Sequence, residues 1–129
     1  MRRGFSLLEI TLVLVIIFIL AGLGASVMFR QVERARWVEA KAILGILRSA
    51  QIRYSIFYKT SFCEDLTYPF ECLDINLTLP NNNFVYQIHN NPRGLAWAFR
   101  RTGTYSGEWM HITYDGDFIY SNIPDWLRD

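Results

Sequence analysis

The feature that most constrains this chain is an uninterrupted apolar run close to its beginning. From Ile10 to Phe29 the sequence contains no charged residue. At a rise of about 1.5 Å per residue, a helix over these positions is about 30 Å long, which matches the hydrocarbon core of a bilayer. The run therefore predicts one membrane-spanning helix. A secretory signal is the alternative, because Ala21 to Ser26 offers small residues at a plausible cleavage position.

A single acidic residue stands at the start of this run. Glu9 follows the largely apolar segment from Phe5 to Leu8. An unpaired carboxylate inside a membrane helix costs about 2.5 kcal/mol or more, so Glu9 is a candidate functional residue. The simpler alternative is a side chain that reaches the lipid headgroups at the membrane edge.

The residues before the run form a recognisable pattern: the basic segment Met1-Arg2-Arg3, then Gly4, Phe5, three residues and Glu9. Over residues 1–24 this resembles the class III signal of type IV pilins and type II secretion pseudopilins. The resemblance implies that a membrane-embedded prepilin peptidase cleaves between Gly4 and Phe5 and methylates the new amino terminus. It also implies a single-pass protein of the inner membrane, with its head in the periplasm, that later joins a filament, a pseudopilus or the cell surface.

Physical chemistry supports the role that the resemblance gives to Glu9. Cleavage would leave a charged α-amino group on Phe5, and Glu9 of a neighbouring subunit could pair with it. Such a pair would also fix the stagger between subunits, as a buried polar residue fixes coiled-coil register. The partners implied are like subunits, other pilins or pseudopilins, the inner-membrane assembly platform and, before assembly, membrane lipid.

Beyond the span the helix is expected to continue to about residue 58. Apolar residues recur at steps of three or four, which marks one face of an amphipathic helix. They are Ile43, Ile46 or Leu47, Ala50, Tyr54 and Phe57. The rest of the chain must cover this face.

The second half of the chain carries strand and turn signals. Residues 84–88, 95–100, 108–114 and 117–120 are β-prone, and turn residues lie between them at Asn90–Gly94 and Asp115–Gly116. We expect three or four antiparallel strands that bury the helix face together with the strand aromatics. The fold class is therefore α+β, a long amino-terminal helix packed against a small antiparallel sheet, similar to the pilin head.

The expected domain organisation follows from these elements. It is a leader at 1–4, a transmembrane and assembly helix at 5–29 and an extracytoplasmic head at 30–129. Within the head we expect the helix continuation to about 58, a loop at 59–83, the sheet at 84–121 and a tail at 122–129. In the loop, apolar residues occupy alternate positions: Leu73, Ile75, Leu77 and Leu79. This alternation predicts a small edge strand or an extended lid over the helix. The tail either caps the sheet edge or contacts a neighbouring subunit.

The two cysteines, Cys63 and Cys72, lie nine positions apart in this loop. The spacing matches no zinc or redox motif. In an extracytoplasmic domain it predicts a disulfide that closes a short loop. Two free thiols are the alternative if the head faces the cytosol.

No catalytic constellation emerges from the sequence, so we expect no enzyme, no cofactor and no metal. His89 and His111 lie on different predicted strands without a nucleophile pattern. Asp115 and Asp117 lack the dense oxygen ligands of a calcium loop, although calcium stays a minor alternative. A net charge of +1 argues against nucleic acid. An arginine cluster at Arg93, Arg100 and Arg101 is interpreted as a solvated sheet edge, with contact to DNA or an anionic partner as the alternative.

The expected function is a structural subunit of a type IV pilus-like filament or type II secretion pseudopilus. The rival is a monomeric, single-pass anchored domain whose aromatic head binds a small ligand or peptide.

Overall fold

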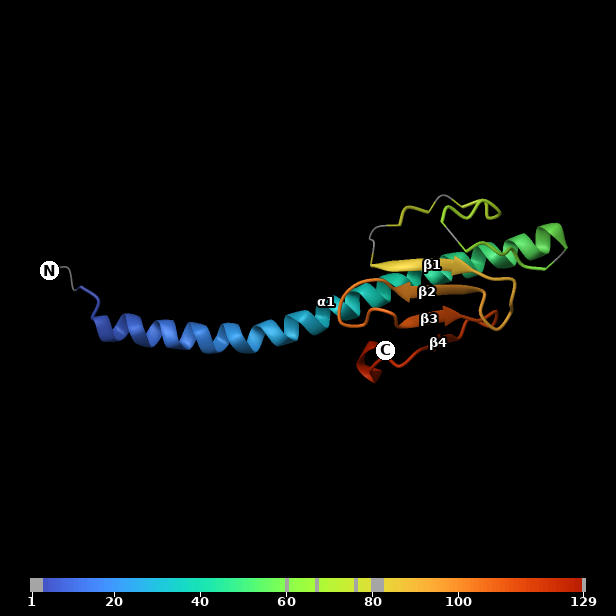
Figure 1. Cartoon of the computed structure of the whole chain (residues 1–129). Coiled ribbons are helices and arrows are strands. Elements are labelled where there is room, and N and C mark those ends of the chain that lie inside the picture. Colours follow the sequence, from blue (N-terminus) through green and yellow to red (C-terminus); the bar gives the residue numbers. More distant parts are fainter. Residues whose placement is uncertain (1–3, 60, 67, 76, 80–82, 129) are drawn as a thin grey trace. The chain divides into compact units, whose positions relative to one another are not determined.

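The computed structural model describes residues 4–59, 61–66, 68–75, 77–79 and 83–128. The chain divides into two compact units, residues 1–35 and 36–129. The elements are the helix α1 (Leu7–Tyr58), the strands β1 (Phe84–Ile88), β2 (Ala96–Arg100), β3 (Trp109–Ile112) and β4 (Phe118–Tyr120), and the short 3-10 helix η1 (Asp125–Leu127) (Figure 1). The predicted α+β fold class is confirmed.

The first unit is the apolar part of α1. The helix begins after Ser6, whose carbonyl oxygen accepts hydrogen bonds from the backbone N–H of Glu9 (3.0 Å) and Ile10 (3.2 Å). Every residue from Gly4 to Val32 is exposed. By length and composition this helix can cross a membrane, and a signal sequence has the same properties.

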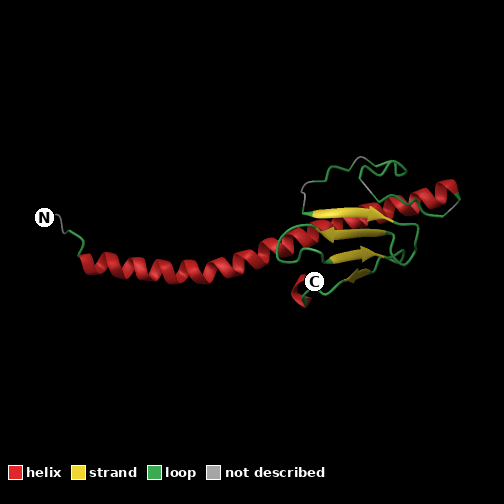
Figure 2. Ribbon diagram, viewed as in Figure 1, coloured by secondary structure: helices red, strands yellow, loops and turns green. Residues whose placement is uncertain are grey.

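The second unit contains a four-stranded antiparallel sheet in the order β1-β2-β3-β4, one face of which lies against the later part of α1 (Figure 2). The register places Trp97 opposite both Gln87 and His111, and His111 opposite Ile119. Consecutive strands pair throughout, as expected for elements that follow one another in the chain.

The core lies between α1 and the sheet. On the helix side the predicted residues Ile43 and Leu47 are buried, together with Trp37, whose ring meets that of Phe84 edge-on at 5.1 Å. The sheet contributes alternate residues of its strands: Phe84, Tyr86, Ile88, Ala96, Ala98, Met110 and Ile112. This alternation is the period-two pattern of a sheet that buries one face.

The expectation that all strand aromatics join this core was wrong. Trp97, Phe99 and Trp109 lie on the outer face of the sheet, and Ala96 and Ala98 face the helix instead. Small side chains allow helix and sheet to approach closely, and indole rings at those positions would force them apart.

The expected burial of Phe57 was also wrong. Its side chain is 79% exposed, and that of Tyr54 is only partly buried. The last turns of α1 extend past the end of the sheet (Figure 1), so that the strands cover the helix only as far as about Gln51.

The loop after α1 is closed by a disulfide and held against the head by a backbone pairing and by buried leucines. Cys63 and Cys72 form the predicted disulfide, and Asp65 pairs with Ile88 at the free edge of β1 through backbone hydrogen bonds of 3.1 and 2.9 Å. Leu73 and Leu77 are buried in the core. Of the two forms expected for this segment, the described residues adopt the extended lid and form no strand.

The tail packs against the head. Ile123 and Leu127 are buried, and Lys41 Nζ donates a hydrogen bond to the carbonyl oxygen of Arg128 at 2.5 Å. Tyr120 Oη donates to the same oxygen at 3.2 Å. The tail is therefore a fixed part of the head.

The three arginines do not form the expected solvated cluster. Arg100 is 2% exposed, lies over the Phe84 ring at 5.0 Å, and donates a hydrogen bond to the Asn83 carbonyl. Arg93 lies before β2 and Arg101 after it, at opposite ends of the strand.

Candidate functional site

The amino-terminal candidate residues lie together at the beginning of α1. Gly4 and Phe5 precede the helix and are exposed, and Glu9 occupies its first turn. The helix dipole places partial positive charge at this end, which favours a carboxylate there. Met1 to Arg3 lie outside the described residues.

The remaining polar side chains of the apolar segment are satisfied within the helix itself. Thr11 Oγ1 donates to the carbonyl oxygen of Leu8 at 2.9 Å, and Ser26 Oγ donates to that of Leu23 at 3.1 Å. Hydroxyls bonded in this way add little polarity to the surface of the helix. Glu9 is therefore the one ionisable side chain between Gly4 and Phe29.

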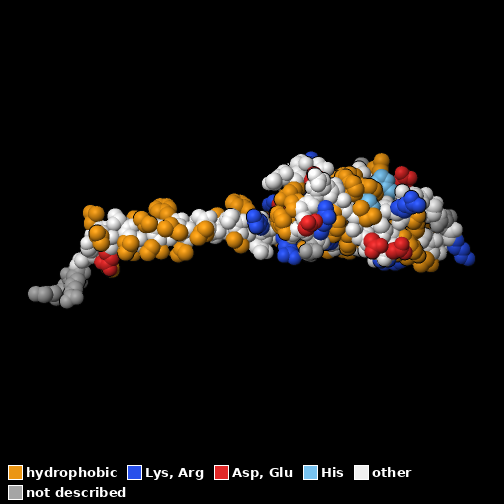
Figure 3. Space-filling model, turned by 90° about the horizontal axis from the view of Figure 1, so that it is seen from below, with side chains coloured by type: hydrophobic (Ala, Val, Ile, Leu, Met, Phe, Trp, Pro, Cys, Tyr) orange, Lys and Arg blue, Asp and Glu red, His pale blue; other side chains and the backbone are white. Residues whose placement is uncertain are grey.

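This arrangement determines what the segment can contact. Hydrophobic side chains cover the early part of α1 (Figure 3), and none of the residues from Gly4 to Val32 is buried. An apolar surface of this extent is stable only against lipid or other apolar helices. Glu9 then needs a cationic or hydrogen-bonding partner wherever the segment is out of water.

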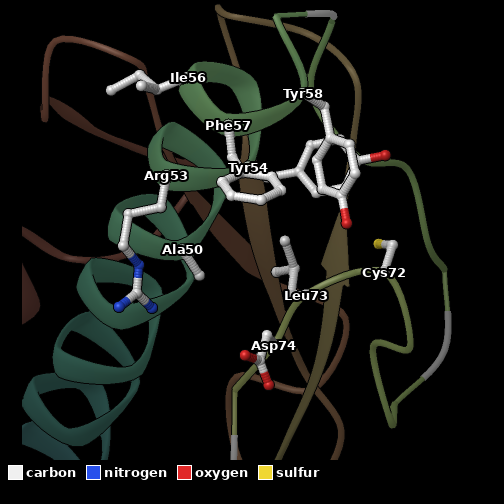
Figure 4. A pocket seen from close by; sticks show the side chains of 9 residues that line it. All are labelled: Ala50, Arg53, Tyr54, Ile56, Phe57, Tyr58, Cys72, Leu73 and Asp74. Atoms are coloured by element: carbon white, nitrogen blue, oxygen red, sulfur yellow. The ribbon is translucent and has the colours of Figure 1, made fainter.

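The head carries a cavity of about 580 Å³ beside the last turns of α1. Its aromatic wall is formed by Tyr54, Phe57 and Tyr58, whose rings lie close together (Figure 4). The Tyr54 and Tyr58 ring centroids are 4.6 Å apart, and those of Phe57 and Tyr58 are 5.0 Å apart. Cavities of this size and apolar character are typical of binding sites.

Two opposite charges lie at the same cavity. Arg53 comes from α1 and Asp74 from the segment after the disulfide (Figure 4). Both side chains are exposed, and neither forms an ion pair within the described parts of the chain. The cavity can therefore receive an apolar group that is flanked by charges. This site was not predicted from the sequence, because the periodicity of the helix had placed Phe57 in the core.

No protein-family model, curated protein or solved structure matches this chain. The architecture itself is pilin-like: a long amino-terminal apolar helix whose later part packs on a four-stranded antiparallel sheet.

The outer face of this pilin-like head carries a ring cluster. The centroid of Trp97 lies 4.2 Å from His111 and 5.0 Å from Trp109, and His89 lies at 5.9 Å. Burial against these rings lowers the pKa of His111, and a hydrogen bond to the backbone of Arg93 opposes this in part. The rings of His89 and His111 therefore both contact the indole of Trp97.

The Asp115–Asp117 turn forms a shallow hollow of about 330 Å³ with Arg93 and Thr113. Gly116 has φ of 101°, which the turn requires. Across the described ranges, no three His, Cys, Asp or Glu side chains are placed to hold a metal ion together.

Proposed function

We propose that this chain is a structural subunit of a type IV pilus-like filament or type II secretion pseudopilus. The observation that carries the proposal is the fully exposed apolar start of α1 with one carboxylate, Glu9, in its first turn. The pattern Gly4-Phe5 followed by Glu9 supports processing by a prepilin peptidase before assembly.

Assembly would follow from the energetics of this segment. Helices that leave the bilayer must bury their apolar surfaces against one another. In that bundle, Glu9 of one subunit would pair with the Phe5 α-amino group of its neighbour, because each charge alone is costly there. The pair would set the axial stagger between subunits.

The head suits a mechanical role outside the cytoplasm. The disulfide Cys63–Cys72 indicates an oxidising compartment such as the periplasm. A small head with a short disulfide loop and a three-residue last strand favours a pseudopilus over an adhesive pilus. The partners would be other subunits, the assembly platform and the peptidase, and no catalytic step is proposed.

The alternative function is a monomeric, membrane-anchored binding domain, and the cavity in the head favours it. Replacement of Glu9 distinguishes this alternative from a filament subunit. In a filament, Glu9→Leu should abolish assembly while membrane insertion persists, because register is lost. The matched control is Thr11→Val, which removes a hydroxyl already bonded to its own helix. Assembled protein is measured as the fraction that pellets after shearing. Normal assembly of Glu9→Leu would instead support a monomeric anchored domain, in which loss of the carboxylate is harmless.

A further inference from the structure

Two apolar features lie at opposite ends of the head. The aromatic cavity lies beside the last turns of α1, and Trp126 lies in η1. The tail that holds Trp126 is bound to Lys41, which is 16 positions before Phe57 along α1, about 24 Å by the helical rise. In Figure 1 the carboxyl end lies at the opposite end of the sheet from the end of α1.

Trp126 is presented on a rigid support. Its side chain is 37% exposed, while its neighbour Leu127 is buried in the core. The ring meets Tyr105 at a centroid distance of 6.3 Å. Because η1 is anchored on both sides of the indole, little conformational entropy would be lost if a partner covered it.

Charges of both signs also lie beside Trp126. Asp125 and Arg128 are exposed, and they form an ion pair of 3.2 Å. The cavity has one cation, Arg53, and one anion, Asp74, that are not paired with each other. An acidic and a basic group beside an indole can therefore meet a basic and an acidic group beside an aromatic cavity.

We propose that the exposed edge of the Trp126 indole of one copy packs into the cavity of a second copy. Asp125 would then lie against Arg53 and Arg128 against Asp74, so that the ion pair beside Trp126 joins the two charges of the cavity. A cavity of about 580 Å³ has room for an indole side chain. Tryptophan and arginine are the residues that most often dominate binding energy at such contacts. The surrounding charges would fix the orientation of the two heads.

The placement of the two surfaces makes the contact head-to-tail. Each copy offers the indole at one end and the cavity at the other, so the same contact can be repeated along a row of copies. Heterologous contacts of this kind produce open helical assemblies when they do not close into a ring. The inference rests on the proposed filament, which supplies a high local concentration of heads, but it uses residues outside the assembly helix.

Photo-crosslinking of the full chain in its native membranes tests the contact. Benzoylphenylalanine at position 126 should form an intermolecular crosslink to residues 53–58 or 72–74 of another copy, identified by mass spectrometry. The control places the same group at Tyr114, an exposed aromatic of the β3–β4 turn, and should not label those segments. Crosslinks from position 126 to any other surface would overturn the proposal.

Charge reversal gives the second test. Arg53→Glu or Asp125→Arg alone should reduce the crosslink yield about five-fold, and the double variant should restore it. A crosslink yield in the double variant as low as in the single variants would contradict the pairing of Arg53 with Asp125.

The same photo-crosslinking probe at Leu14, in the assembly helix, distinguishes failure of the head contact from failure of the filament. If Leu14 crosslinks persist and those from position 126 are absent, only the head contact fails. If both are absent, the filament fails as well.

Discussion

The side-chain amide of Gln51 forms two hydrogen bonds with the backbone of Cys63. Gln51 Nε2 donates to the Cys63 carbonyl oxygen at 2.7 Å, and Gln51 Oε1 accepts from the Cys63 N–H at 2.9 Å. Gln51 is fully buried. This residue therefore joins α1 to the loop that carries the disulfide and reaches the edge of β1.

Loss of this amide should destabilise the head strongly. In Gln51→Ala the buried N–H and C=O of Cys63 lose their partners, which costs about 2–4 kcal/mol in the free energy of unfolding. Ser49→Ala is the control, since Ser49 is exposed and bonds only within α1. Denaturant unfolding of the full chain in detergent measures both. Equal stability of the two variants would show that water replaces the hydrogen bonds that Gln51 forms with the backbone N–H and C=O of Cys63.

Removal of the disulfide should also weaken the head. The bond closes a loop of sequence separation nine, so the chain-entropy model gives about 2–3 kcal/mol for Cys63→Ala with Cys72→Ala. Because Gln51 holds the same loop, adding Gln51→Ala to this double variant should cost less than it does in the wild type. Strict additivity of the measured free energies would contradict a shared role.

The head should lose stability as the pH falls below about 7. Burial lowers the pKa of His111 below its ordinary value of 6.5. As the pH drops, the unfolded chain therefore binds a proton before the folded chain does, and folding becomes less favourable. His111→Gln should reduce the difference in unfolding free energy between pH 7.5 and pH 5.5, while the control Val85→Leu, an exposed position on the same face of the sheet that carries no titratable group, should leave it unchanged. An unchanged difference in His111→Gln would exclude this histidine as the cause.

Enlarging the core face of β2 should be costly. Ala98 is fully buried between sheet and helix, so Ala98→Leu should cost about 1–3 kcal/mol of stability through overpacking. Val85→Leu adds bulk to an exposed position on the outer face and should change stability by less than about 0.5 kcal/mol. The midpoint of thermal unfolding compares the two variants.

The elements were largely predictable because their signals are local. The strand expected at residues 84–88 is observed as Phe84–Ile88, and the helix expected to end at about 58 ends at Tyr58. The charge-free run and the turn residues carry this information without reference to the rest of the chain. The disulfide was predictable from cysteine spacing and the expected compartment.

The faces of β2 and the cavity were not predictable because they depend on long-range packing. Both faces of β2 contain apolar residues, and only the closeness of α1 decides that Ala98 turns inward and Trp97 outward. Likewise, Phe57 continues the apolar periodicity of the helix, yet the sheet ends before reaching it. A local sequence pattern does not indicate how far the helix extends past the end of the sheet.

The central claim is that the chain is a processed subunit that assembles through its amino-terminal helix. Intact mass and amino-terminal sequencing of protein recovered from its native membrane test this most directly. The proposal predicts a chain that begins at N-methylated Phe5. A chain that retains Gly4 would contradict prepilin processing and leave an anchored domain, and a chain that begins near Ala25 would contradict it in favour of a secretory signal.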